Sequence, residues 1–183
     1  MGKEPDDFVK AVKVLLDLNF THIGINLGCP VKKVVSSGKG SAILEKPELV
    51  GEILCKIKKA FSDKPDISIK IRISYKNWKN PFFYLELAEK YNLKSICIHG
   101  RSREMGYTGE ADWEIIREMK KRSEKIQVIG NGDLFTIKDI IKKSEYAKPD
   151  AVMLARGIFG NPWLVGEAVE YFKTGKIKKY NTS

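Results

Sequence analysis

The sequence predicts an α/β fold in which about five parallel strands alternate with helices. Five short apolar runs have the length and the residue types of buried strands. Segments with apolar residues at helical spacing lie between these runs, and polar or glycine residues gather directly after them. This alternation is typical of βα repeats built around a parallel sheet.

The expected elements follow one another along the whole chain. Pro5 and Pro47 suit the first turns of two helices, and Asp112 is expected to cap a third. Strands are expected at residues 22–28, 67–73, 95–99, 126–133 (with the exit of that strand) and 151–155. Helices are expected at about residues 5–19, 47–61, 81–91, 113–122, 136–144 and 163–173, and residues 174–183 form a basic tail.

Two architectures fit such repeats: an open doubly wound sheet and a (β/α)8 TIM barrel. No Gly-x-Gly-x-x-Gly motif opens a helix after the first strand, which disfavours a dinucleotide-binding doubly wound fold. Glycines follow the last two strands, at 130–133 and 156–160, where barrels usually bind a phosphate. Because a complete barrel has eight strands and about 250 residues, residues 1–173 are predicted to form a partial TIM barrel.

The composition excludes several classes of protein. No run approaches the roughly 20 apolar residues of a membrane span, and the first residues lack the apolar core of a signal peptide. Three scattered cysteines argue against a disulfide framework and a metal site, and they fit the cytoplasm. The net charge of +10 makes nucleic acid the first candidate partner, although solvated lysine-rich helices give a similar excess.

Residues 22–44 contain the most specific pattern of the chain. An apolar strand ends near Asn26, and Gly28, Cys29 and Pro30 then place a thiol on a tight turn, with two lysines just beyond. Parallel strands present their chemistry at this end, so the thiol suits a nucleophile or an acid that faces an anionic partner. A Gly-Cys-Pro turn alone can also simply end a strand, with the thiol as a small buried side chain.

The whole stretch resembles the signature of the tRNA-dihydrouridine synthases, in which Asn-x-Gly-Cys-Pro ends the fourth strand of a TIM barrel. The resemblance covers about residues 5–173. It implies that the first three barrel strands and the C-terminal helical domain of that family lie outside this sequence. A sheet of five strands would then have two open edges, and a second chain is a candidate to cover them.

The resemblance also implies a reaction and its participants. FMN, reduced by NADPH, would transfer a hydride to a uridine of tRNA, and Cys29 would donate the proton that completes 5,6-dihydrouridine. A thiol is mostly protonated at neutral pH and can serve as a general acid. The residues expected to bind FMN are Lys70, His99, Asn131, Gly132, Asp133, Ala155, Arg156 and Gly157. Those expected to bind the substrate are Asn26, Arg72, Arg101, Arg103 and Tyr107.

For several of these residues, their chemistry and spacing also indicate a role in binding, independently of the resemblance. Lys70 and Arg72 lie two apart on a strand and share one face, which is costly unless something anionic or electron-rich meets them. The loop with Arg101, Arg103 and Tyr107 suits phosphate contact and base stacking. The glycines at 130 and 132 would let a phosphate approach the main chain. Ser102 and Ala155 depart modestly from the residues usual in the family, Thr and Gly.

Two alternative functions stay open at this point. One is an FMN barrel that acts on free pyrimidines, similar to dihydroorotate or dihydropyrimidine dehydrogenases. The other is an inactive barrel remnant that binds RNA or pairs with another barrel fragment. The basic excess and the arginine loop favour a macromolecular anion over a free base.

Overall fold

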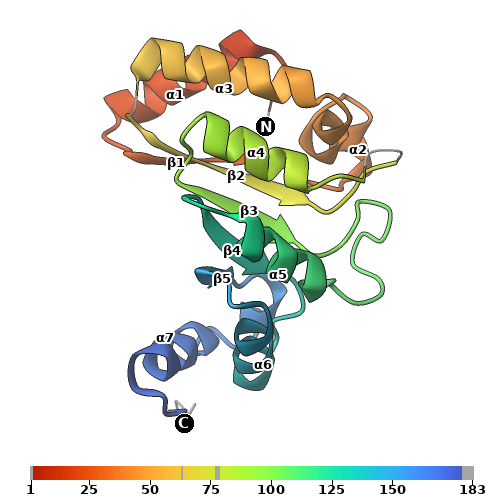
Figure 1. Ribbon diagram of the computed structural model, residues 1–183, viewed down its shortest axis with the longest axis vertical. Coiled ribbons are helices and arrows are strands. Elements are labelled where there is room, and N and C mark those ends of the chain that lie inside the picture. The colour runs from red at the N-terminus through yellow and green to blue at the C-terminus, as the bar shows by residue number, and fades with distance from the viewer. Residues whose placement is uncertain (1, 63, 77–78, 179–183) are drawn as a thin grey trace.

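A five-stranded parallel sheet forms the centre of the computed structural model, which describes residues 2–62, 64–76 and 79–178. The strands pair in chain order, as the staves of a barrel do, and not in the reversed order of a doubly wound sheet. This arrangement confirms the predicted fold class (Figure 1). The strands are β1 (His22–Asn26), β2 (Asp66–Arg72), β3 (Ser95–His99), β4 (Gln127–Asn131) and β5 (Ala151–Met153).

The helices appear where apolar spacing predicts them. They are α1 (Pro5–Asp17), α3 (Pro47–Phe61), α4 (Phe82–Lys90), α5 (Trp113–Arg122), α6 (Ile137–Ala147) and α7 (Leu164–Thr174). Asp112 caps α5 as predicted, because its carboxylate accepts hydrogen bonds from the main-chain N–H groups of Glu114 and Ile115. Residues 179–183 of the predicted basic tail lie outside the described part of the chain.

The structure differs from the predicted elements in several places, among them the ends of α1 and β1, which each end two residues early. The stretch between β1 and α3 is not a plain loop, because it contains α2 (Lys32–Val35) and the 3-10 helix η1 (Gly40–Glu45). β5 ends two residues early, where the chain turns through Ala155 into a second 3-10 helix, η2 (Arg156–Ile158). α6 continues to Ala147, since Lys148 ends it in the left-handed conformation.

The two faces of the sheet have opposite character. On one face, alternate residues such as Ile69 and Ile98 are buried against the helices, and burying each such side chain contributes about 1.5–3 kcal/mol to stability. The other face is more polar, although it also carries Ile129 and Met153, and the strands at its edges expose Gly24 and Ala151. The helices of the described residues thus lie on one side of the sheet (Figure 1).

The strand register gathers polar residues of the second face into rows. Asn26 pairs with Lys70, and Arg72 pairs with His99, which in turn pairs with Asn131. These residues stand at the carboxyl ends of their strands. Because parallel strands end at the same edge, side chains from distant parts of the sequence meet there.

The outer strands of the sheet have unpaired edges, and the helices at the two ends of the helix layer expose apolar residues. Among the described residues, no strand pairs with the outer edge of β1 or of β5. Val14 of α1 (57%) and Leu18 directly after it (62%) are exposed, and α7 exposes Val165, Val169 and Phe172 at helical spacing. These two apolar stripes lie at opposite ends of the molecule (Figure 1). Within the described residues, no helix is long and apolar enough to cross a membrane.

We expect the 183-residue chain by itself to associate through these open ends, because unpaired strand edges and apolar stripes both favour contact with another chain. The double variant Val14→Lys, Leu18→Lys should weaken the association about tenfold or more, since it removes apolar surface from the interface. Sedimentation velocity over a range of concentrations measures this. Asp17→Lys changes the net charge by the same two units but removes no apolar surface, and it serves as the control. A monomeric parent chain that melts cooperatively would contradict the expectation.

Candidate functional site

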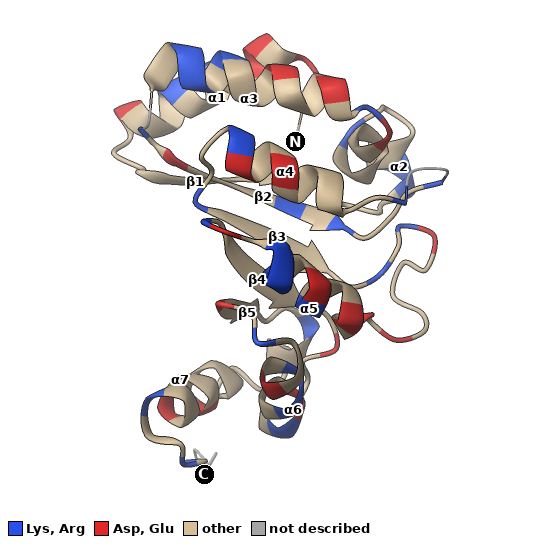
Figure 2. Ribbon diagram, in the orientation of Figure 1, with Lys and Arg blue, Asp and Glu red and all other residues tan. Residues whose placement is uncertain are grey.

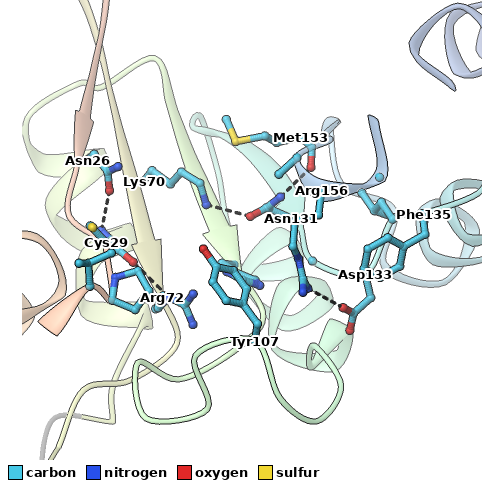
Figure 3. A pocket seen from close by; sticks show the side chains of 18 residues that line it. Asn26, Cys29, Lys70, Arg72, Tyr107, Asn131, Asp133, Phe135, Met153 and Arg156 are labelled. Carbon is cyan, nitrogen blue, oxygen red and sulfur yellow. Dashed lines mark hydrogen bonds and ion pairs between the residues drawn. The ribbon is translucent and has the colours of Figure 1, made fainter. Parts of the chain in front are cut away.

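A pocket of about 250 Å³ opens at the carboxyl ends of all five strands. Figure 3 shows its polar side chains converging from the strand ends and their loops. It is lined by twelve of the fourteen residues singled out in the sequence, which places the predicted cofactor and substrate residues around one cavity. They are Asn26, Cys29, Lys70, Arg72, His99 and Tyr107 from the first three units, and Asn131, Gly132, Asp133, Ala155, Arg156 and Gly157 from the last two.

The turn that holds Cys29 is fixed from two sides. The side-chain Oδ1 of Asn26 accepts a hydrogen bond from the Gly28 N–H (3.0 Å), which leaves the amide Nδ2 of Asn26 as a donor for a ligand. The Ser41 N–H donates to the Cys29 carbonyl (3.0 Å). Gly40 has φ +60°, and a Cβ there would lie 2.8 Å from that carbonyl oxygen, so only glycine lets the two segments approach this closely.

Arg72 joins this turn to the loop after β3. Its side chain is 2% exposed. The guanidinium Nε donates to the Gly28 carbonyl (3.1 Å), and Nη1 donates to the carbonyls of Ser102 (2.7 Å) and Gly106 (2.9 Å). Burial lowers the pKa of the Arg72 guanidinium, the Tyr107 phenol opposes that shift, and the three carbonyls satisfy the buried charge.

A second buried cation, Lys70, reaches across the sheet. Its Nζ donates to Asn131 Oδ1 (2.9 Å), and the Asn131 Nδ2 donates to the Met153 carbonyl (2.7 Å). This chain of hydrogen bonds links β2, β4 and β5 across the floor of the pocket (Figure 3). Burial lowers the pKa of the Lys70 ammonium. A cation with few surrounding oxygens favours a ligand with electron-rich atoms at this point.

His99 is buried between cations. Burial, and then the charges of Arg72, Lys70 and Arg101, lower its pKa to about 3, so the imidazole is neutral near pH 7. Its Nε2 lies 3.5 Å from Arg101 Nη1. Because a guanidinium only donates, Nε2 is the acceptor and the proton of the neutral ring resides on Nδ1.

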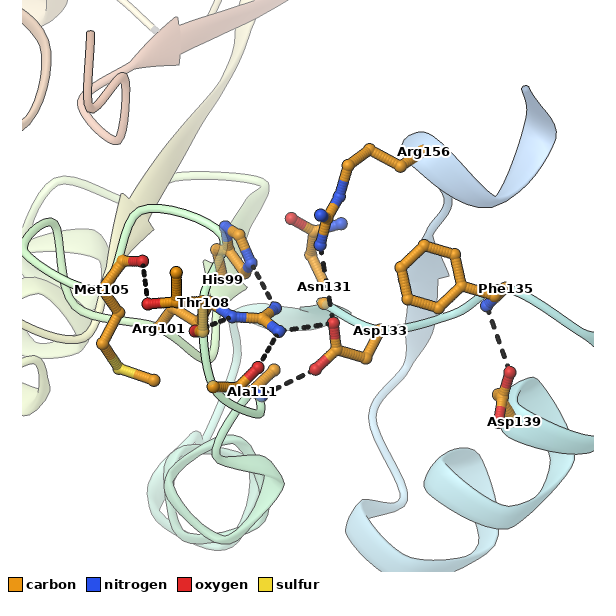
Figure 4. Close-up of polar contacts among 12 residues, drawn as sticks. His99, Arg101, Met105, Thr108, Ala111, Asn131, Asp133, Phe135, Asp139 and Arg156 are labelled. Carbon is orange, nitrogen blue, oxygen red and sulfur yellow. Dashed lines mark hydrogen bonds and ion pairs between the residues drawn. The ribbon is translucent and has the colours of Figure 1, made fainter.

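Arg101, which is predicted to contact the substrate, lies outside the pocket. It is 2% exposed and does not line the pocket. Its guanidinium forms an ion pair with Asp133 (2.7 Å) and donates to the carbonyls of Thr108 (3.0 Å) and Gly109 (2.5 Å), as Figure 4 shows. Arg103 also lies outside the pocket lining, with its guanidinium 5.9 Å from the Tyr75 ring centroid. Arg101 therefore holds the loop that presents Tyr107.

Asp133 connects the loops after β3 and β4. Its carboxylate pairs with Arg101 and accepts a hydrogen bond from the Ala111 N–H (2.8 Å). Burial alone would raise the pKa of Asp133, but the Ala111 N–H and Arg101 outweigh it and lower the pKa. Arg156 Nη2 lies 3.6 Å from the same carboxylate, so one acid orients arginines from two loops.

The glycines after β4 and β5 serve different contacts. Gly132 has φ +125°, and a Cβ there would lie 2.6 Å from the Ala111 Cβ. A Cβ on Gly157 would overlap the Leu134 carbonyl oxygen, so these loops touch through their main chains. Gly130 faces the helices instead of a ligand, because its missing Cβ makes room for the Trp113 ring at 2.6 Å. The expectation that Gly130 admits a phosphate is therefore wrong.

Sequence reasoning missed several apolar residues of the pocket wall. Met153, Phe135, Leu134 and Val31 line the pocket, and Phe135 is 43% exposed. The alternation along β5 could have indicated Met153, since it shares a face with Ala151. Phe135 follows the predicted Asp133 loop but has no local signal that separates it from a core residue.

The fold and the pocket together define the class of protein: a βα-repeat chain whose strand ends and following loops surround one polar pocket. The family model of dihydrouridine synthase (Dus) matches residues 1–183. The chain belongs to the dihydrouridine synthase family.

Individual relatives agree with this placement. The chain is 36% identical over 177 residues to tRNA-dihydrouridine synthase B of Proteus vulgaris, covering 96% of this chain and 54% of that protein. It is 35% identical over 164 residues to tRNA-dihydrouridine synthase B of Pasteurella multocida, covering 89% of this chain and 48% of that protein. The chain thus spans about half the length of the relatives it matches.

A solved structure shows the same arrangement of elements. A complex of 2-naphthoyl-CoA reductase with 2-naphthoyl-CoA superposes with a TM-score of 0.67 at 15% identity, covering 91% of this chain and 28% of that one. At this identity the likeness concerns the fold alone.

We expect Asp133→Asn to destabilise the chain by about 3 kcal/mol, because it leaves the buried Arg101 charge without its partner. Urea denaturation measures the change in the free energy of unfolding. The control is Asp17→Asn, which breaks the exposed Lys13–Asp17 pair and should cost less than about 1 kcal/mol. Equal effects of the two substitutions on the free energy of unfolding would show that the buried Arg101–Asp133 pair stabilises the chain no more than an exposed pair does.

His99 should make stability depend on pH. Its pKa of about 3 in the folded chain lies below the ordinary histidine value. Its contribution to the free energy of unfolding is therefore complete above about pH 6.5. That contribution falls as the pH falls, because the unfolded chain then takes up a proton that the folded chain does not. Between pH 6.5 and 5 we expect a loss of about 1–2 kcal/mol that His99→Gln abolishes and His22→Gln does not. Urea denaturation at several pH values tests this; equal slopes for the parent chain and His99→Gln would contradict it.

Proposed function

We propose that this chain forms the catalytic part of a tRNA-dihydrouridine synthase, which reduces uridine in tRNA to 5,6-dihydrouridine with FMN as cofactor. The observation that supports this most directly is the Cys29 turn, held beside a pocket that also contains Lys70, Asn131 and Arg156. The relatives from Proteus vulgaris and Pasteurella multocida, named tRNA-dihydrouridine synthase B, support the same function.

The residues of the pocket fit a flavin mononucleotide. The partly buried Lys70 ammonium suits an electron-rich ring edge, and the neutral His99 can donate from Nδ1 beside it. Asn131 and Ala155 line the same wall. The close main-chain approach at Gly132 and Gly157, next to Arg156, suits a phosphate, with Asp133 orienting that arginine.

FMN, when bound, supplies the hydride for carbon 6 of the uracil, and this chain supplies the proton. We assign the proton for carbon 5 to the Cys29 thiol, because it lines the pocket on a turn with little freedom. Asn26 has a free amide donor toward the same space. Tyr107, exposed at the mouth, offers a ring to the flipped base, and Arg72 lies beneath it.

The arginines of the 100–111 loop divide into two roles in this proposal. Arg101 positions the loop and so acts on the substrate through Tyr107 and Asp133. Arg103 stays a predicted contact for the RNA backbone. Its Nε atom is buried without a hydrogen-bond partner among the described residues, and Arg103 directly follows Ser102, whose carbonyl accepts a hydrogen bond from Arg72.

The remaining parts of the proposal concern the whole protein. We propose NADPH as the reductant, the cytoplasm as the compartment, and residues 1–173 as a barrel portion followed by a basic tail. The open edges of β1 and β5 suit further βα units or a second chain that completes the sheet.

We expect Cys29→Ala to leave FMN binding unchanged and to lower the rate of uridine reduction by a factor of 100 or more, because a positioned general acid contributes about 10²–10⁴-fold. FMN binding is measured by quenching of flavin fluorescence. Reduction is measured as dihydrouridine formed in unmodified tRNA with NADPH. Cys55→Ala is the matched control, because Cys55 lies on α3 outside the pocket.

Three results would overturn parts of the proposal. Parental rates in the Cys29→Ala variant would remove the thiol from the reaction. Turnover of free uracil without tRNA would support the pyrimidine dehydrogenase alternative. Salt-sensitive RNA binding by a chain that takes up no FMN would support an inactive remnant.

A further inference from the structure

A second groove lies beside the pocket, between the 100–111 loop and α6. It shares a wall with the pocket, made by Tyr107, Asp133, Phe135 and Arg156. Its far side is formed by Lys142 of α6 and its neighbour Lys143. A ligand that leaves the pocket over this wall therefore enters the groove directly. None of the residues predicted for FMN lies on the α6 side.

The carboxylates in the groove are mostly committed to other partners. Asp133 is paired with Arg101. Asp139 accepts hydrogen bonds from the start of α6 and caps that helix. Glu110 is exposed on the loop side. Lys142 is exposed as well, and within the described part of the chain it has no hydrogen-bond or ion-pair partner. The α6 side of the groove thus presents an unneutralised cation, and Figure 2 shows basic residues on that helix.

The shared wall is a stack of flat groups. The Arg156 guanidinium lies 4.6 Å from the Tyr107 ring centroid and 5.2 Å from the Phe135 ring centroid. Tyr107 is 58% exposed and Phe135 is 43% exposed, and Figure 4 shows Phe135 beside Arg156. An exposed phenylalanine ring keeps apolar surface in contact with water, which is unfavourable, and a ligand that covers the ring removes this cost. Aromatic rings and arginine planes are the surfaces on which unpaired bases stack.

We propose that this groove binds the RNA strand next to the target nucleotide, with a neighbouring base stacked on Phe135 and a phosphate held by Lys142. The inference rests on the proposed function and adds to it a path for the substrate. Stacking surfaces that alternate with cations are what single-stranded nucleic acid requires. The net charge of +10 favours a polyanion over a small dinucleotide such as NADPH.

The test uses the full 183-residue chain with FMN and a fluorescent, unmodified tRNA transcript. Phe135→Leu keeps an apolar side chain but removes the ring, and it should raise the Kd for tRNA about tenfold. Lys142→Ala should lower the slope of log Kd against log salt by about 1. Matched controls are Phe20→Leu and Lys125→Ala, which change exposed residues before β1 and β4, at the opposite end of the sheet. Both controls should stay within about twofold of the parent.

The outcomes separate this inference from the function on which it rests. Unchanged tRNA affinity and salt slope in both groove variants would overturn the inference and leave the proposed function intact. A higher Kd for NADPH with unchanged tRNA binding would also overturn it, because the groove would then be a dinucleotide site. A parent chain that binds FMN but no tRNA would count against the proposed function itself.

Discussion

The buried guanidinium of Arg72 is the constraint on which the mouth of the pocket depends. A cation in that position is stable only when carbonyl oxygens meet its donors, and those oxygens come from the Cys29 turn and from the loop after β3. Each carbonyl fixes Arg72, and Arg72 in turn fixes both segments. The thiol and Tyr107 therefore take their places relative to one side chain, although they are far apart in the sequence.

The sheet separates stability from chemistry by face. Alternate residues of each strand pack against the helices and supply the apolar burial that holds the fold. The other set is free to be polar, and hydrogen bonds within the sheet, such as Ser68 with Ser95 at 2.8 Å, satisfy part of it. Lys70 and Asn131 belong to this set and line the pocket at the carboxyl ends of their strands. A site can thus change without disturbing the core.

The sequence predicts most of the fold and the pocket because both follow local patterns. Strands show as apolar runs, and the pocket residues directly follow them. Arg101 shows where this reasoning stops: its charge favours a ligand phosphate, but its partner is Asp133, and no local pattern indicates an ion pair between distant residues. The prediction that Gly130 lets a phosphate approach is wrong for a similar reason, since the sequence does not show that Trp113 packs against this glycine. Phe135 is an apolar residue whose exposure depends on the tertiary structure.

The proposed reaction needs a fixed proton donor and a mobile contact for the base, and the contacts of Cys29 and Tyr107 match these two needs. A proton donor must keep its geometry. The Cys29 turn is held by a hydrogen bond that it donates to Asn26 and by two that it accepts from Arg72 and Ser41. A flipped base must enter and leave, and Tyr107 is exposed between the arginines at 72 and 156. Contacts between a cation and a ring face depend less on direction than a hydrogen bond does. The ring can therefore shift over a base while the thiol below it stays in place.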